Sequence, residues 1–176
     1  MSKYLKVFMA GVFVIVFILL LVSHITAQDN KWVTYHGDFA SFLVKDDFEL
    51  DYENKGGSIK YIIKFAENPE YMLIIENGIS QMNYKIASKK GYKLDTQNAL
   101  FQQGKGLEKS GTTPQGNRFR EIFLYYTTAG EKVPQRSLVY VAYDNVPSEL
   151  ADHFDTIIDS IKLKNVYEEP LPFPQN

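Results

Sequence analysis

The stretch Ser137-Leu138-Val139-Tyr140-Val141-Ala142-Tyr143 decides the expected fold, because almost every position in it is apolar, aromatic or β-branched. A strand with one face in water would alternate polar and apolar side chains, so this run predicts a central strand that is covered on both faces. The turn Asp144-Asn145-Val146-Pro147 ends the strand. A fold organised around such a strand needs one covering layer on each side of its sheet.

A helix is predicted directly after this turn, with Ser148 as its N-cap. Its apolar residues recur at helical spacing and form one stripe that consists of Leu150, Phe154, Ile157, Ile158 and Ile161. We expect Phe154 to be deeply buried against the central strand and Asp155 to lie on the polar side of the helix. The short segment Ile161-Lys162-Leu163 closes the unit.

A second helix is predicted over residues 68–91. Asn68-Pro69 suits the start of a helix, and Gly91 suits its end. The apolar positions again recur three or four residues apart, at Met72, Ile75, Ile79, Met82 and Ile86. Glycine is unfavourable inside a helix, so Asn77-Gly78 could instead be a turn between a strand at 71–75 and a shorter helix.

The other predicted elements are strands, over residues 32–35, 39–44, 48–53, 58–66, 92–96 and 119–127. Residues 97–115 are polar and rich in glycine, and they could hold one more strand around Leu107. The sequence therefore predicts an α+β fold, in which an antiparallel sheet of about six strands is flanked by two main helices.

Residues 1–27 are predicted to be a targeting segment. Lys3 and Lys6 precede an apolar run, and Ile25-Thr26-Ala27 fits a signal-peptide cleavage site before Gln28. The apolar run is also almost long enough for an uncleaved membrane anchor. Either reading places a single domain, residues 28–164, outside the cytoplasm as a secreted, periplasmic or membrane-anchored domain. Residues 165–176 form an acidic, proline-rich tail that is predicted to be extended or disordered.

Composition and motifs point away from several functions. The net charge of -2 argues against a nucleic-acid binder, and the absence of cysteine excludes a thiolate metal site. His36, in a His-x-Asp pair with Asp38, and His153 lack metal-site spacing and are interpreted as surface residues. The glycine-rich residues 104–111 fail the phosphate-loop spacing and are interpreted as a flexible loop. No catalytic residue, metal ligand or cofactor site is predicted.

Two groups of charged residues remain. The acidic row Asp47, Glu49, Asp51 and Glu53 is interpreted as a solvated strand face rather than a calcium site. Four lysines gather near the predicted end of the second helix, namely Lys85, Lys89, Lys90 and Lys93. These lysines are candidate contacts with a partner or a membrane surface, although the helix dipole alone would also favour them there.

The order of elements resembles a known family. The segments Phe39-Ala-Ser-Phe-Leu-Val and Phe48-Glu-Leu come before the predicted helix that ends near Gly91-Tyr92-Lys93, and the chain closes with Phe154-Asp-Thr-Ile-Ile-Asp-Ser-Ile-Lys-Leu. This arrangement resembles the PsbP-like α/β/α sandwich, which DcrB-type bacterial envelope proteins share. The resemblance implies an antiparallel sheet between helices, and binding or assembly roles rather than catalysis.

The sequence thus predicts an exported, non-catalytic domain that binds a protein partner or supports an envelope assembly. One alternative is a carrier of a small apolar ligand, with a cavity lined by Met72, Ile75, Met82 and strand aromatics. A metal-dependent hydrolase is a further alternative, and it would need a pocket where His36 or His153 meets a carboxylate.

Overall fold

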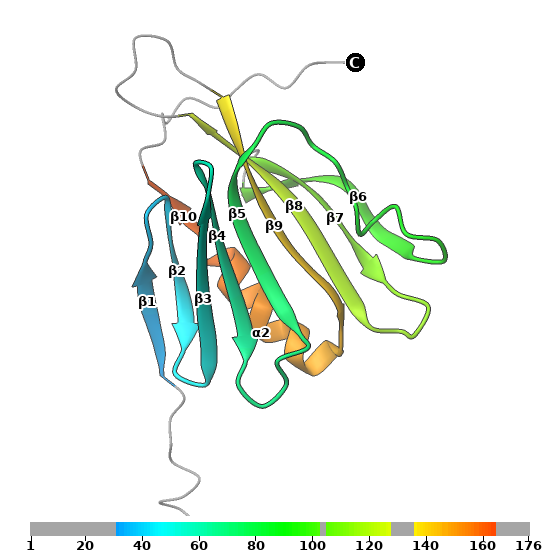
Figure 1. Cartoon of the computed structure of the whole chain (residues 1–176). Coiled ribbons are helices and arrows are strands. Elements are labelled where there is room, and N and C mark those ends of the chain that lie inside the picture. Colours follow the sequence, from blue (N-terminus) through cyan, green and yellow to red (C-terminus); the bar gives the residue numbers. More distant parts are fainter. Residues whose placement is uncertain (1–30, 103–104, 128–135, 165–176) are drawn as a thin grey trace, which may run out of the picture. The chain divides into compact units, whose positions relative to one another are not determined.

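The computed structural model describes residues 31–102, 105–127 and 136–164. Within these ranges the chain forms ten strands and one helix (Figure 1). The strands are β1 (Trp32–His36), β2 (Ala40–Lys45), β3 (Phe48–Lys55), β4 (Ser58–Phe65), β5 (Met72–Ile79), β6 (Lys93–Phe101), β7 (Gly106–Thr112), β8 (Arg118–Thr127), β9 (Arg136–Val146) and β10 (Lys162–Leu163). The helix, α2, spans Ser148–Asp159.

The strands form two antiparallel sheets. The smaller sheet has the order β1-β2-β10, and the larger has the order β3-β4-β5-β9-β8-β7-β6. β9 is therefore the middle strand of the larger sheet, which confirms the prediction of a central strand. α2 lies against one face of this sheet (Figure 1).

The predicted α/β/α sandwich with two main helices is wrong, because the described residues contain a single helix and are mostly β-strand. Residues 72–79 of the expected second helix form β5, which pairs with β4 and β9, and residues 80–91 form no helix. Leu73 and Ile75 are buried on the α2 face of the sheet, while Ile74 lies on the other face. Gly78 has a positive φ of 75°, which a helix cannot accommodate, and it falls at a register shift in the β5–β9 pairing.

The region around Leu107 holds the additional strand that the sequence left open. Residues 106–112 form the regular strand β7 instead of a flexible loop, and β6 continues to Phe101 beyond its predicted end. Gly111 permits this pairing, because a Cβ atom there would lie 1.9 Å from the carbonyl oxygen of Lys93 on β6. The pairing of β6 with β7 contains two register shifts, one at Leu94/Thr96 and one at Gln97/Ala99.

The hydrophobic core lies between α2 and the two sheets. The helix buries Ala151, Phe154, Ile157 and Ile158, and Phe154 is 0% exposed, which confirms the expected stripe. Pro147, and not Ser148, is the N-cap, and no side chain caps this end. The carbonyl of Pro147 accepts the N–H groups of Leu150 and Ala151, so the first turn closes through the backbone.

The opposite face of the larger sheet is covered by residues 80–92, which we call the cover segment. The ring of Tyr84 lies edge-on to Phe123 at 5.0 Å, and the ring of Tyr92 lies 5.2 Å from Phe119. Both phenylalanines are 1% exposed. The central strand is thus covered on both faces as predicted, but one cover is an irregular segment and not a helix.

The predicted targeting segment and the acidic tail lie outside the described residues. In the part of the chain that the structure does describe, no helix has the length and apolarity needed to cross a membrane.

Candidate functional site

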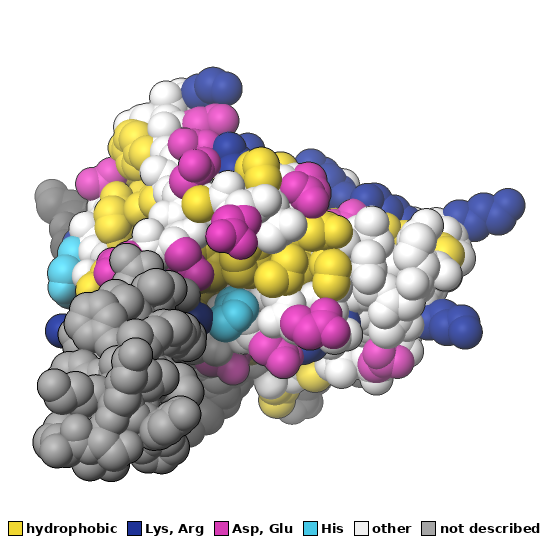
Figure 2. All heavy atoms as spheres, turned by 90° about the horizontal axis from the view of Figure 1, so that it is seen from below, with side chains coloured by type: hydrophobic (Ala, Val, Ile, Leu, Met, Phe, Trp, Pro, Cys, Tyr) yellow, Lys and Arg dark blue, Asp and Glu magenta, His cyan; other side chains and the backbone are white. Residues whose placement is uncertain are grey.

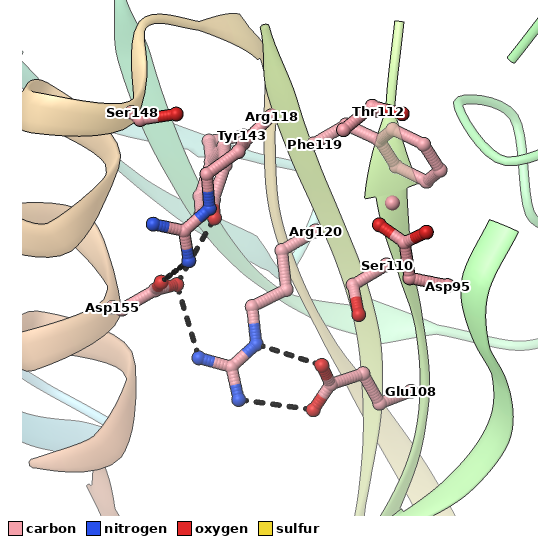
Figure 3. A pocket seen from close by; sticks show the side chains of 11 residues that line it. Asp95, Glu108, Ser110, Thr112, Arg118, Phe119, Arg120, Tyr143, Ser148 and Asp155 are labelled. Atoms are coloured by element: carbon pink, nitrogen blue, oxygen red, sulfur yellow. Dashed lines mark hydrogen bonds and ion pairs between the residues drawn. The ribbon is translucent and has the colours of Figure 1, made fainter. Parts of the chain in front are cut away.

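A polar hollow of about 430 Å³ lies between α2 and the β6–β8 half of the larger sheet (Figure 3). Its lining is rich in charged and hydroxyl groups and consists of Asp95, Glu108, Ser110, Gly111, Thr112, Arg118, Phe119, Arg120, Tyr143, Ser148 and Asp155. Arg118 and Arg120 reach the same side of β8 because alternate strand residues share a face. The helix supplies its acids from one flank, three or four residues apart.

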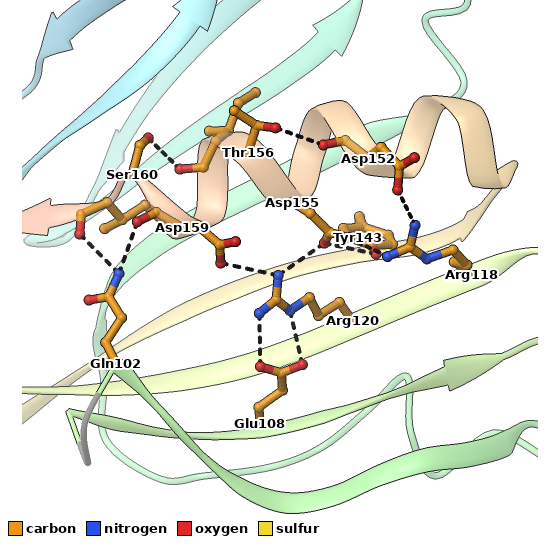
Figure 4. Close-up of polar contacts among 12 residues, drawn as sticks. Gln102, Glu108, Arg118, Arg120, Tyr143, Asp152, Asp155, Thr156, Asp159 and Ser160 are labelled. Carbon is orange, nitrogen blue, oxygen red and sulfur yellow. Dashed lines mark hydrogen bonds and ion pairs between the residues drawn. The ribbon is translucent and has the colours of Figure 1, made fainter.

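Arg120 is the centre of an ion-pair network in this hollow (Figure 4). Its Nε and Nη2 atoms donate to the two carboxylate oxygens of Glu108 at 3.0 and 2.9 Å, and its Nη1 atom donates to Asp155 at 3.0 Å. Arg118 donates to Asp152 and Asp155, and the Tyr143 hydroxyl also donates to Asp155 at 3.1 Å. The network therefore joins α2 to β7, β8 and β9.

The environment of the network raises the pKa values of Arg120 and Tyr143. Desolvation alone would lower the pKa of Arg120, but the hydrogen bond to Glu108 and the charges of Glu108 and Asp155 outweigh it and raise that pKa above its ordinary value. Burial, with the nearby charge of Asp155, raises the pKa of the Tyr143 hydroxyl. Arg120 stays a cation and Tyr143 stays a proton donor, so neither can serve as a general base near pH 7.

The network clamps the helix to the sheet and occupies the guanidinium groups that an anionic ligand would need. Asp155 does not lie on an open polar face as expected, because its side chain is only 18% exposed and accepts three partners. Among the described residues, no cluster of three or more potential ligands could hold a metal ion. The alternation of Arg118 with Arg120 and the helical spacing of the acids are sequence signals for this clamp.

The four candidate lysines do not sit at the end of a helix. Lys85, Lys89 and Lys90 lie in the cover segment, whereas Lys93 begins β6 and pairs in register with Thr112 of the α2 face. Lys89 donates to Asp144 and lies over the ring of Tyr92. Lys85 and Lys90 are exposed, and their side chains form no ion pair with any described acid.

A further lysine joins them on the face opposite α2. Lys109 of β7 places its Nζ atom 4.2 Å from the ring centroid of Tyr84 in the cover segment. We call Lys85, Lys89, Lys90 and Lys109 the lysine surface. Sequence reasoning missed Lys109, because nothing in the sequence shows that β7 lies beneath the cover segment.

The acidic row of β3 is mostly a paired sheet surface. Asp51 accepts Lys64 at 2.5 Å, and Glu53 lies 3.9 Å from Lys60 and 3.4 Å from Lys55. These ion pairs explain the alternating acids without a bound cation.

His36 and His153 lie apart from the polar hollow. His36 is exposed on β1, and the carboxylate of Asp38 accepts the hydroxyl of Tyr52. His153 is half-buried among the rings of Trp32, Phe48 and Phe65, and its Nδ1 atom lies 3.2 Å from Lys45 Nζ. Figure 2 shows one face of the domain, where hydrophobic side chains gather with acidic side chains around them.

We expect His153 to make the stability of the domain depend on pH. Desolvation and the charge of Lys45 lower the pKa of His153 below 6.5, although Asp47 and Asp152 oppose this shift. The unfolded chain therefore takes up a proton first as the pH falls, so stability is present above that ordinary pKa and is lost on acidification. Between about pH 7.5 and 5.5, the free energy of unfolding measured with urea should fall more for the wild type than for a His153→Gln variant. Equal losses would contradict this assignment.

The residues expected to line an apolar cavity are not brought together. Ile75 is buried in the core, while Met72 and Met82 are 37% and 42% exposed. The Met82 sulfur accepts the hydroxyl of Tyr125 at 3.5 Å, on the cover segment.

Comparison with known proteins returns no match to a family model, to a curated protein or to a solved structure.

Proposed function

We propose that this chain is an exported, non-catalytic domain that binds an acidic protein partner through the lysine surface. The observation that carries the proposal is the set of lysines on the cover segment. Lys85 and Lys90 are exposed and unpaired among the described residues, and Lys109 is held over Tyr84 beside them. In a chain whose net charge is -2, such a local excess of positive charge attracts an acidic partner and steers its approach.

The structure gives these lysines a fixed support. The cover segment is held on the sheet by aromatic contacts, by hydrogen bonds of its backbone, and by Lys89 and Tyr92, which both donate to Asp144. A surface that is already ordered loses little conformational entropy when a partner binds.

The resemblance to PsbP-like proteins points to binding or assembly as well. The proposal does not depend on it, because the two-helix sandwich that the resemblance implied is absent from the described residues.

A triple variant with Lys85, Lys90 and Lys109 replaced by alanine should bind an acidic probe roughly tenfold more weakly than wild type, since three exposed ion pairs of about 0.5 kcal/mol each contribute about 1.5 kcal/mol. The probe is polyglutamate, and its affinity is measured by titration calorimetry at low and at physiological salt. The matched control replaces Lys31, Lys55 and Lys162, three exposed lysines that lie outside the cover segment and β7.

The control variant should keep the wild-type affinity, and added salt should weaken the wild type toward the triple variant. Equal losses in both variants would mean that only net charge matters, and this result would overturn the proposal. Binding to vesicles that contain anionic lipid, without binding to polyglutamate, would overturn it in favour of a membrane surface.

A further inference from the structure

A buried carboxylate lies directly beneath the lysine surface. Glu121 of β8 is 0% exposed, and it points away from α2 because its neighbour Ile122 packs into the core on the helix face. Its Oε1 atom accepts the backbone N–H of Lys85 at 2.8 Å, and its Oε2 atom accepts those of Ile86 at 3.1 Å and Ala87 at 2.9 Å. Three consecutive amides of the cover segment therefore converge on one side chain.

The surroundings of Glu121 suit a charged carboxylate without a cationic partner. The hydroxyl of Tyr140 donates to Oε1 at 2.9 Å, and the carboxylate forms no ion pair with any described lysine or arginine. Hydrogen bonds from several backbone amides to a carboxylate are charge-assisted and stronger than those between neutral groups. A buried carboxylate is costly unless it is satisfied in this way.

We propose that Glu121 is the positioning residue of the lysine surface, and this inference rests on the proposed function. Glu121 fixes the backbone at residues 85–87, and so it fixes the direction in which Lys85 and the following Lys90 leave the domain. The other attachments of the cover segment flank this point. The Tyr84 hydroxyl donates to the carbonyl of Leu107 at 3.3 Å on one side, and Asp144 holds Tyr92 on the other.

Replacement of Glu121 by Gln separates positioning from charge. Glutamine keeps one acceptor oxygen but turns an NH₂ group toward the amides, so part of the amide cluster loses its acceptor. The same change removes a negative charge from beneath the lysines, which by itself would strengthen the binding of an acidic probe. A positioning role predicts weaker binding, and a purely electrostatic role predicts tighter binding.

The experiment compares wild type, Glu121→Gln and Glu108→Gln in the full chain. Glu108 is the matched control, because it is also a paired glutamate with a side chain only 13% exposed, but it faces α2. Hydrogen exchange at the amides of residues 85–87 is measured together with the affinity for polyglutamate. In Glu121→Gln we expect exchange at these amides to rise roughly tenfold or more, and affinity to fall several-fold. In Glu108→Gln both should stay at the wild-type values.

The binding and exchange results each test the positioning role of Glu121. Unchanged or tighter binding by a folded Glu121→Gln variant would overturn the positioning role, while the proposed function would stand if the triple lysine variant still loses affinity. If Glu121→Gln does not fold, wild-type exchange decides instead. The amides of residues 85–87 should then be protected relative to those of residues 81–83, and equal exchange would overturn the inference.

Discussion

The Phe154→Ala variant should lose about 3–5 kcal/mol of the free energy of unfolding, the usual cost of removing a large aromatic side chain from a core. The ring of Phe154 is 0% exposed and packs against three aromatic rings, with centroid separations of 4.8 Å to Phe65, 5.8 Å to Tyr143 and 6.1 Å to Phe48. Domains are commonly stable by only about 5–15 kcal/mol, so this variant should show a much lower melting temperature or fail to accumulate as soluble protein.

The control is Glu149→Ala, which introduces the same residue at an exposed position in the first turn of the same helix. It should change stability by no more than about 0.5 kcal/mol. Asp155→Ala, which the sequence alone suggested as a neutral change, is not a valid control, because Asp155 accepts Arg118, Arg120 and Tyr143. Similar melting of Phe154→Ala and wild type would show that the helix is not packed on the sheet.

Replacement of Arg120 by Met should cost about 3 kcal/mol or more, because it leaves the acids that Arg120 joins without their common cation. Methionine keeps most of the apolar stem, so the loss reports on the charge and its hydrogen bonds. The side chains of Arg120 and Glu108 are only 14% and 13% exposed, so water compensates little. Urea denaturation of the purified variant measures the effect.

A double-mutant cycle with Glu108→Gln tests whether the two residues act as a pair. Removing both charged partners should cost clearly less than the sum of the two single changes, since a lone buried charge is the expensive state. Additive losses would mean that the bidentate contact contributes nothing of its own, and that Arg120 stabilises the domain through its contacts with α2 instead.

The unit formed by β9 and α2 could be read from the sequence because its signals are local. The two-sided apolar run of residues 137–143 fits only a buried strand. The stripe that contains Phe154 fits only a helix. Residues 72–79 are different, since apolar spacings of three and four also arise in a strand that is buried on both faces. What decides between them is the pairing of β5 with β9, which lies far away in sequence, and the positive φ of Gly78.

The ion-pair network around Arg120 and the cover segment could not be predicted from the sequence. The alternation of Arg118 with Arg120 and the helical spacing of Asp152 with Asp155 were both visible, but only the fold shows that they face each other. Glu121 carries even less signal, because its partners are backbone amides, which any residue other than proline supplies. The sequence shows that the four lysines lie close together along the chain, but the helix expected to carry them is absent from the described residues.

The irregular pairing of β6 affects how readily this edge of the sheet could pair with a second molecule. β6 is the outermost strand of the larger sheet, and its two register shifts lie at Leu94/Thr96 and Gln97/Ala99. A regular outer strand offers evenly spaced donors and acceptors to any extended chain nearby, and this invites fibrous aggregation. The interrupted spacing along β6 denies a second molecule a continuous ladder of hydrogen bonds. Even with Leu94 and Leu100 exposed along it, this edge is poorly suited to growing into a polymer.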